Sequence, residues 1–202
     1  MALSVIETPD SRQDRLRPRL HRPSFLQELA RTVLFVVVVT VLFDMAIPRS
    51  LVDGRSMETT FFTGDRLIVS RLHYMLDTPK RGEIVVFNSI NPREREQGVM
   101  LIKRIIGLPN ERIEFRDGEL YINDVRTEEP YIKEACAQFS CPDALWQLHD
   151  TQYFVMGDNR NASQDSRRFG PITIQDIVGE AVFRYWPPQK LGLITGYSYP
   201  TP

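Results

Sequence analysis

An uncharged, valine-rich run near the N-terminus constrains this 202-residue chain most strongly. The run, TVLFVVVVTVLF, covers residues 32–43 and is followed by Asp44 and then by Pro48. A helix needs about 20 apolar residues to cross a bilayer, and extending the run back to Phe25 supplies that length. The sequence therefore predicts a membrane-crossing helix over residues 25–48.

Two other interpretations of this run remain open. A buried core helix or strand is equally apolar, and valine favours strands. A cleavable signal peptide also has an apolar segment, but no A-x-A-like site follows the run, and a long polar leader precedes it. Positive charge at one flank holds that flank in the cytoplasm, and six arginines but no lysines occur up to residue 31: Arg12, Arg15, Arg17, Arg19, Arg22 and Arg31. We therefore expect a cytoplasmic leader over residues 1–24, an uncleaved single-pass anchor over 25–48, and residues 49–202 across the membrane.

Composition excludes several classes of function. The formal net charge of −1 provides no basic field for nucleic acid. The chain has no P-loop, no G-x-G-x-x-G segment and no Cys/His cluster with metal-ligand spacing. We therefore expect no nucleic-acid partner, no cofactor and no metal. Cys136 and Cys141, the two cysteines of the chain, would form a small disulfide loop in an oxidising compartment. Two unconnected reduced thiols are the alternative.

The region after Leu51 has the alternating pattern of strands. Candidate strands cover Arg66–Leu72, Glu83–Ile90, Val99–Gly107, Gln152–Gly157 and Glu180–Trp186. Asp117-Gly118 predicts the turn of a hairpin over residues 114–124. Thr173 has the character of an N-cap, which predicts a short helix over Thr173–Val178. The whole indicates a mainly β domain, with a second, smaller β region inserted at about residues 110–150.

Lys103 is the lysine whose surroundings are most unusual, because it lies within the apolar segment LIKRII. In a strand, Lys103 shares one face with Leu101 and Ile105, and Arg104 lies on the other face, which is also apolar. Arginine stays protonated in proteins, whereas burial lowers the pKa of lysine and makes its neutral amine a usable general base. A lysine that bends to the surface at a sheet edge is the alternative.

Other catalytic patterns receive little support. The segment around Ser56 lacks the second glycine of G-x-S-x-G. Nothing in the sequence points to a Ser-His-Asp triad, and we interpret each of the three histidines, His21, His73 and His149, as a surface or partly buried side chain. The stretch over residues 157–170 alternates acids and arginines after an apolar strand, which is typical either of a solvated loop or of a loop held rigid by ion pairs.

Four segments, in order behind the apolar run, resemble type I signal peptidases. GRSMETT begins at Gly54, and RGEIVVF begins at Arg81. KRIIGLPNE begins at Lys103, and GDNRNASQDSR begins at Gly157 and matches every fixed position of the family segment. The resemblance covers Leu51 to about Trp186. It implies a β-sheet or barrel-like catalytic core with an inserted smaller β region, and a serine endopeptidase that removes N-terminal signal peptides from exported preproteins.

The resemblance also implies residue roles. Ser56 is the nucleophile, with its backbone N–H as an oxyanion donor, Lys103 is the general base, and Ser163 orients the Lys103 amine. The loop scaffold is then Asp158, Arg160, Asp165 and Arg167, and the substrate pockets, which accept small residues such as alanine, are lined by Val52, Met57 and Ile102. The expected partners are preprotein signal peptides and the lipid bilayer of a plasma or thylakoid membrane, and we expect a monomer.

Two departures from the family pattern bear on activity. Thr59 replaces a proline that rigidifies the turn behind the nucleophile. Gly54 stands where some members have a serine whose hydroxyl is a second oxyanion donor. Thr59 alone keeps open a catalytically impaired relative with a binding or scaffold role, and the presence of Ser56, Lys103 and Ser163 argues against it. A different Ser-Lys protease, such as a self-cleaving repressor, is a third alternative, but the anchor and the lack of a DNA-binding helical domain count against it.

Overall fold

The computed structural model describes residues 24–46 and 49–199, so the predicted leader lies outside the described residues. The chain divides into two units, residues 1–42 and 43–202. The apolar run forms the helix α1 (Phe25–Ala46) and not the strand that its valines allow. Over Phe25–Leu42 the mean hydropathy is 1.9, and none of this window is buried. By length and composition, α1 can cross a membrane.

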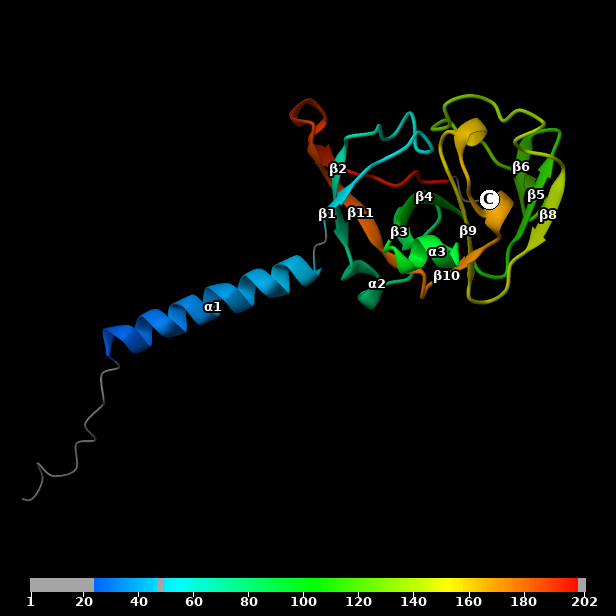
Figure 1. Cartoon of the computed structure of the whole chain (residues 1–202). Coiled ribbons are helices and arrows are strands. Elements are labelled where there is room, and N and C mark those ends of the chain that lie inside the picture. The colour runs from blue at the N-terminus through cyan, green and yellow to red at the C-terminus, as the bar shows by residue number, and fades with distance from the viewer. Residues whose placement is uncertain (1–23, 47–48, 200–202) are drawn as a thin grey trace, which may run out of the picture. The chain divides into compact units, whose positions relative to one another are not determined.

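The second unit is built on an eight-stranded antiparallel sheet (Figure 1). Along the sheet the strand order is β1-β2-β11-β3-β4-β9-β10, and β12 pairs with β11 off this path. The bounds are β1 Arg49–Leu51, β2 Arg66–Ser70, β3 Ile84–Asn88, β4 Met100–Gly107, β9 Gln152–Met156, β10 Ile172–Thr173, β11 Ile177–Trp186 and β12 Gly192–Leu193. The mainly β prediction is therefore confirmed, and each of the five candidate strands overlaps an observed one.

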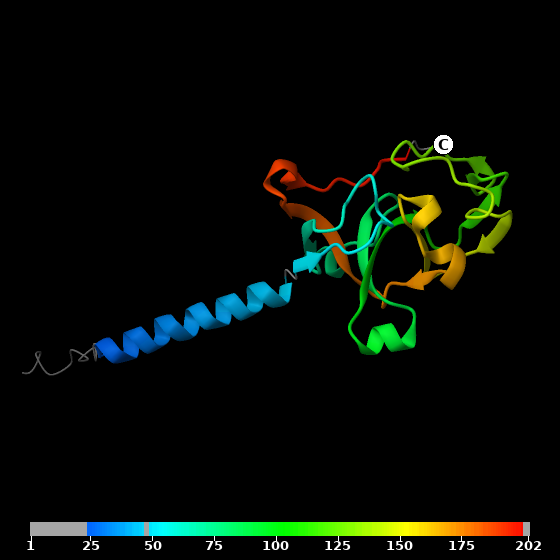
Figure 2. The same cartoon turned by 45° about the horizontal axis from the view of Figure 1, so that its top comes forward.

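A smaller four-stranded sheet is inserted between β4 and β9, with the order β7-β6-β5-β8. Its strands are β5 Arg112–Arg116, β6 Glu119–Ile122, β7 Val125–Arg126 and β8 Ala144–Gln147. The predicted hairpin is confirmed as β5–β6, with Asp117 and Gly118 in the turn, both at positive φ. Figures 1 and 2 both show this green-to-yellow sheet at one side of the large sheet, beyond β9.

The short helices lie in the connections. They are α2 His73–Leu76, α3 Pro92–Glu96 and α4 Ser166–Phe169, with 3₁₀ turns η2 Arg160–Ala162 and η3 Pro188–Lys190. The predicted helix over Thr173–Val178 is wrong. Thr173 does bond Asp176, through its N–H at 2.9 Å and its hydroxyl at 2.8 Å, but the chain enters β11 at Ile177. The capping interaction closes a single turn, and from Ile177 onward the chain forms a strand that pairs with β3.

Three apolar clusters hold the domain together. The first joins the two sheets, because Ile106 and Phe154 of the large sheet pack with Ile113 and Phe115 of the small one. The second lies behind the segment after β1 and contains Met57, Phe61 and Leu67 among others. The third lies around Val85, Ile105 and Val155 of the central strands. A rigid core therefore supports β4 from several sides, and β4 carries Lys103.

Candidate active site

Ser56 and Lys103 are brought together from separate parts of the domain. Ser56 lies in the turn that follows β1, and Lys103 lies in the middle of β4, opposite Val85 of β3. The Lys103 ammonium, Nζ, is 2.8 Å from Ser56 Oγ and 2.9 Å from the carbonyl oxygen of Ile102. Both distances are within hydrogen-bond range. The 47-residue separation in sequence thus becomes one direct contact.

Burial controls the charge of Lys103, whose relative exposure is 3%. Removal from water lowers its pKa from 10.5 to about 8, although the negative charges of Asp165 and Asp158 oppose this shift. Desolvation disfavours the charged form of an amine, and neither carboxylate pairs directly with Nζ among the described residues. Near pH 8, a large fraction of Lys103 is therefore neutral and able to accept a proton.

The turn that carries Ser56 is held by its neighbours. The N–H of Asn159 donates to the Ser56 carbonyl at 3.0 Å, and its side-chain amide donates to the Arg55 carbonyl at 3.1 Å. The N–H of Phe61 closes the turn on the Met57 carbonyl at 2.8 Å. Thr59, at the position of the family proline, is exposed, and its hydroxyl is 3.5 Å from the Tyr131 carbonyl. Contacts from the 157–170 loop thus fix the turn that carries Ser56.

The donors for an oxyanion are limited on this turn. Within the described residues, the Ser56 N–H has no acceptor, so it is free to bind a substrate oxygen. Gly54 has φ of +102°, a conformation that residues with a side chain rarely adopt. Its N–H and carbonyl bond the Thr63 hydroxyl at 3.1 and 3.2 Å. Gly54 therefore shapes the turn and presents no side-chain donor.

Ser163 lies close to the pair, and Gly157 is the residue that makes room for it. A Cβ atom built at Gly157 would overlap both Ser163 Oγ and the Ser56 carbonyl oxygen. Ser163 Oγ is buried and makes no hydrogen bond within the described residues, so the expected bond from Ser163 to the Lys103 amine is not formed in this structure. Its hydroxyl is near enough to Asp165 to contribute weakly to lowering the pKa of that carboxyl.

The four predicted scaffold residues are all buried or nearly so, but only one ion pair joins two of them. Arg167 binds Asp165 at 2.8 and 2.7 Å, and Asp165 also accepts the Gly157 N–H at 3.1 Å. Burial alone would raise the pKa of Asp165, but Arg167 outweighs it and holds the pKa below its usual range. Arg160 donates to the Gly157 carbonyl at 3.0 Å. The loop is therefore bonded to both the N–H and the carbonyl of Gly157.

The other two scaffold residues pair with partners that the sequence analysis did not assign. Arg104 grips both oxygens of Asp158, at 2.8 and 2.7 Å, and the Thr60 hydroxyl bonds the same carboxylate. Arg160 pairs with both oxygens of Glu129 from the small-sheet region. A buried arginine requires an acidic partner, so the apolar segment around Arg104 could have predicted that Arg104 pairs with a carboxylate. Nothing in the sequence near Glu129 indicated that it would pair with Arg160.

A groove of about 280 Å³ opens beside the Ser56–Lys103 pair. Val52 and Ile102 line it as expected, but Met57 does not, because it is 1% exposed and packs in the core behind the turn. The full lining is Ser50, Leu51, Val52, Asp53, Ser56, Leu67, Val86, Met100, Leu101, Ile102 and Lys103. The groove is thus largely apolar, with the hydroxyl and amine at its wall.

Cys136 and Cys141 form a disulfide, with an S–S distance of 2.00 Å. The Arg167 guanidinium lies against it, 3.4 Å from Cys136 Sγ and 3.1 Å from Cys141 Sγ, and donates to the Ser140 carbonyl at 3.0 Å. The small loop closed by this disulfide is therefore linked through Arg167 to the loop that carries Ser163.

Comparison with known proteins gives the class first. Residues 26–186 match the family model described as "Signal peptidase, peptidase S26", and this places the chain among serine endopeptidases. The match begins inside α1 and ends with β11, so it includes the groove and every strand of the two sheets except β12.

Three relatives agree with this class. "Probable signal peptidase I-2" of Synechocystis is 35% identical, over 83% of this chain and 77% of its own length. "Signal peptidase I" of Leptolyngbya laminosa is 33% identical, over 92% of this chain and 91% of its own. "Thylakoidal processing peptidase 1, chloroplastic" of Arabidopsis thaliana is 36% identical, over 83% of this chain but only 51% of its own length. The chain belongs to the signal peptidase family S26.

Proposed function

We propose that this chain removes N-terminal signal peptides from exported preproteins with Ser56 as nucleophile and Lys103 as general base. The observation that carries the proposal is the 2.8 Å contact between Ser56 Oγ and a buried Lys103 Nζ whose pKa is about 8. A hydroxyl is a weak nucleophile until a neighbouring base takes its proton, and this amine is the base in contact with it.

The proposed reaction transfers the acyl group of the substrate to Ser56 and then to water. Neutral Lys103 takes the proton of Ser56 as Oγ attacks the carbonyl carbon before the cut, and the resulting ammonium gives a proton to the leaving amine as the peptide bond breaks. Lys103 then takes a proton from water, the hydroxide attacks the Ser56 ester, and the proton returns to Oγ. As Oγ attacks, negative charge develops on the carbonyl oxygen of the substrate. This oxygen can accept a hydrogen bond from the Ser56 N–H, which has no other acceptor within the described residues.

Ser163 and the ionic scaffold have positioning roles in this proposal. The Ser163 hydroxyl is buried next to Ser56 and has no hydrogen bond within the described residues, so a change of its side-chain rotamer is open to it. We assign it the role of orienting the Lys103 amine when substrate fills the groove. The ion pairs of Asp158, Arg160, Asp165 and Arg167 hold the loop that carries it.

The groove supports a preference for small side chains. Its volume of about 280 Å³ is shared between more than one substrate residue, and Val52, Leu67, Val86 and Ile102 make its walls apolar. Alanine at the first and third positions before the cut suits such shallow pockets. The substrate class we propose is therefore preproteins with A-x-A-type sites.

The anchor supports a location as well as a substrate. We propose that α1 crosses the membrane once, with the arginine-rich leader in the cytoplasm and the peptidase domain on the extracytoplasmic side. The disulfide between Cys136 and Cys141 supports this side, because disulfides persist in oxidising compartments. Signal peptides emerge across the same bilayer.

Cleavage of a secretory precursor in detergent tests the proposal. The wild-type chain is compared with Ser56→Ala and with Ser198→Ala, a control at an exposed serine. We expect wild type and control to cut after the A-x-A site, as mass spectrometry of the products can show, and Ser56→Ala to be inactive. A precursor with leucine in place of the alanine just before the cut is expected to remain intact. No cutting by a folded wild type would favour the catalytically impaired relative.

A further inference from the structure

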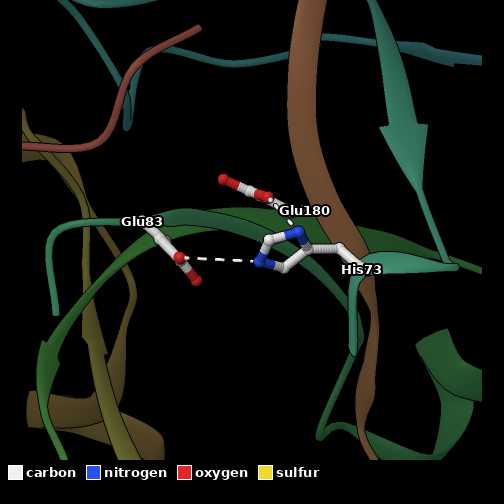
Figure 3. Close-up of side chains that lie close together, drawn as sticks. All are labelled: His73, Glu83 and Glu180. Atoms are coloured by element: carbon white, nitrogen blue, oxygen red, sulfur yellow. Dashed lines mark ion pairs between the residues drawn. The ribbon is translucent and has the colours of Figure 1, made fainter. Parts of the chain in front are cut away.

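Outside the groove, three titratable side chains from three segments meet at one place (Figure 3). His73 begins α2, Glu83 lies just before β3, and Glu180 lies on β11. One potential ligand atom from each lies within 4.8 Å of the other two. The imidazole ring stands between the two carboxylates, with a nitrogen directed at each. None of the three lines the groove.

Existing contacts fix the orientation of Glu83. Its Oε2 accepts the Tyr74 hydroxyl at 2.8 Å and the Lys80 N–H at 2.9 Å. Its Oε1 is thereby turned toward His73 Nε2, at 3.8 Å. Hydrogen bonds that hold a carboxylate from behind are typical of metal sites, because they fix the ligand atom in place.

The three groups are close but not joined by hydrogen bonds. His73 Nδ1 is 3.6 Å from Glu180 Oε2, and both ion-pair distances exceed the usual hydrogen-bond range of about 2.7–3.2 Å. His73 Nε2 is buried and has no hydrogen-bond partner within the described residues. An ion binds one imidazole nitrogen, and the two distances above involve different nitrogens, so the relevant measure is the 4.8 Å within which one ligand atom of each residue lies. Ligands around a tetrahedral zinc ion are about 3.3 Å apart, given bonds of about 2.0–2.1 Å. The Glu180 carboxylate must therefore turn from His73 Nδ1 toward Nε2 when an ion binds.

Charge in the cluster also favours a cation. The side chains of Glu83 and Glu180 are only 13% and 14% exposed. The other groups that face the cluster are Lys80, which ion-pairs with Asp77, and Tyr74 and Tyr153, whose hydroxyls carry no positive charge. Two largely buried carboxylates thus face one imidazole.

We propose that His73, Glu83 and Glu180 bind one divalent transition-metal ion of the zinc type, with water completing its coordination. One imidazole and two carboxylates are ordinary zinc ligands, and the nitrogen donor favours zinc over calcium or magnesium. The ion would join α2 to β11 and to the start of β3, which pair with each other. Its role is to stabilise this part of the sheet, since β3 separates β11 from the strand that carries Lys103.

Zinc titration of the full chain in detergent tests the proposal. The protein is purified with a histidine-free tag, stripped with a chelator and titrated with Zn²⁺ by calorimetry. We expect one saturable ion per chain. His73→Gln and Glu180→Gln should each weaken binding at least about tenfold. His149→Gln and His21→Gln, at the other two histidines of the chain, are matched controls that should leave binding unchanged.

Thermal denaturation supplies a second readout that does not depend on peptidase activity. At a hundredfold excess over the wild-type dissociation constant, Zn²⁺ should raise Tm of the wild type by about 5 °C or more, and that of the folded variants by about half as much or less. The absence of saturable Zn²⁺ binding by the wild type overturns the site. Equal losses in a control variant overturn the ligand set, and Ca²⁺ binding as tight as that of Zn²⁺ overturns the metal class.

Discussion

In the eight-stranded sheet, β4 carries buried charge, whereas the ion pairs within the four-stranded sheet are at least partly exposed. Arg104 and Asp158 have side-chain exposures of 3% and 0%, whereas Arg126 and Glu119, which pair across β6 and β7, have 54% and 45%. Among the buried charged side chains of the described residues, Lys103 is the one without an ion pair. The buried ion pairs stabilise the domain, whereas Lys103, which is buried without an ion pair, is the residue that we assign to catalysis.

Lys103→Met is expected to have the largest effect. It removes the proposed base and keeps an unbranched, apolar side chain, so catalysis should fall by about 10²–10⁴-fold. Because a desolvated amine is replaced, Tm should not fall below that of the wild type. Precursor cleavage and thermal denaturation measure both quantities, with Lys190→Met as a control at an exposed lysine. Full activity in Lys103→Met would remove lysine from the mechanism.

Asp158→Asn breaks the buried ion pair with Arg104, whereas Lys103→Met removes a buried group that has no ion pair. It leaves the Arg104 guanidinium buried without a full counter-charge, and it weakens the Thr60 contact. The free energy of unfolding should drop by about 3–5 kcal/mol, as urea denaturation followed by circular dichroism can measure. A loss below about 1 kcal/mol, as for a surface pair, would show that the two sheets do not differ in this respect.

Gly157→Ala changes a residue that lies between Ser56, the proposed nucleophile, and Ser163. The added methyl group overlaps the Ser163 hydroxyl and the Ser56 carbonyl oxygen, so both must shift. A misplacement of about 1 Å can cost about a hundredfold in rate, and steady-state cleavage should show a loss of that order. Gly192→Ala is the matched control, since its Cβ meets nothing within 4 Å. Equal activities of the two variants would contradict the conclusion that a methyl group at residue 157 displaces Ser56 and Ser163.

The rate should also depend on pH. Lys103 must be neutral to act as a base, and its pKa is about 8. As pH rises through this value the amine loses its proton, so kcat/KM should increase about tenfold from pH 7 to a plateau above pH 9. Cleavage assays over this range, with substrate stability checked in parallel, measure the profile. A flat profile with chemistry rate-limiting would exclude an amine base of this pKa.

Arg126→Gln should have the smallest effect. Arg126 and Glu119 pair in water, where an ion pair contributes little. We expect the same cleavage rate and a change in Tm below about 2 °C. Differential scanning calorimetry can measure that change. A loss as large as that of Asp158→Asn would mean that the small sheet depends on its surface charges.

The sequence predicted local structure well and long-range partners poorly. The alternation around Lys103 and the Asp117-Gly118 turn depend on neighbours in the chain, so β4 and the β5–β6 hairpin could be anticipated. The pairing of Arg160 with Glu129 could not be anticipated, because the two residues are 31 positions apart in the sequence. Burial of Met57 likewise depends on how the turn packs on the core.

The Thr173–Val178 error has the same origin. Thr173 and Asp176 form the local bonds that a helix start requires, and the sequence contains no more than that. Pairing of Ile177 with Phe87 of β3 decides the conformation of the next residues. Among the site residues, the contact of Ser56 with Lys103 was expected from the family resemblance, and the alternation pattern alone left it open.

The strand order has a consequence for a chain that emerges gradually during synthesis. β2 and β3 follow one another in sequence, yet β11 lies between them in the sheet. Until β11 has emerged, β2 and β3 lack the strand that lies between them. Ser56, between β1 and β2, and Lys103, on β4, are then not held in one sheet. Non-local pairing of this kind forms late in folding. A growing chain therefore stays inactive until nearly all of the domain is available, so a truncated product would not be a protease.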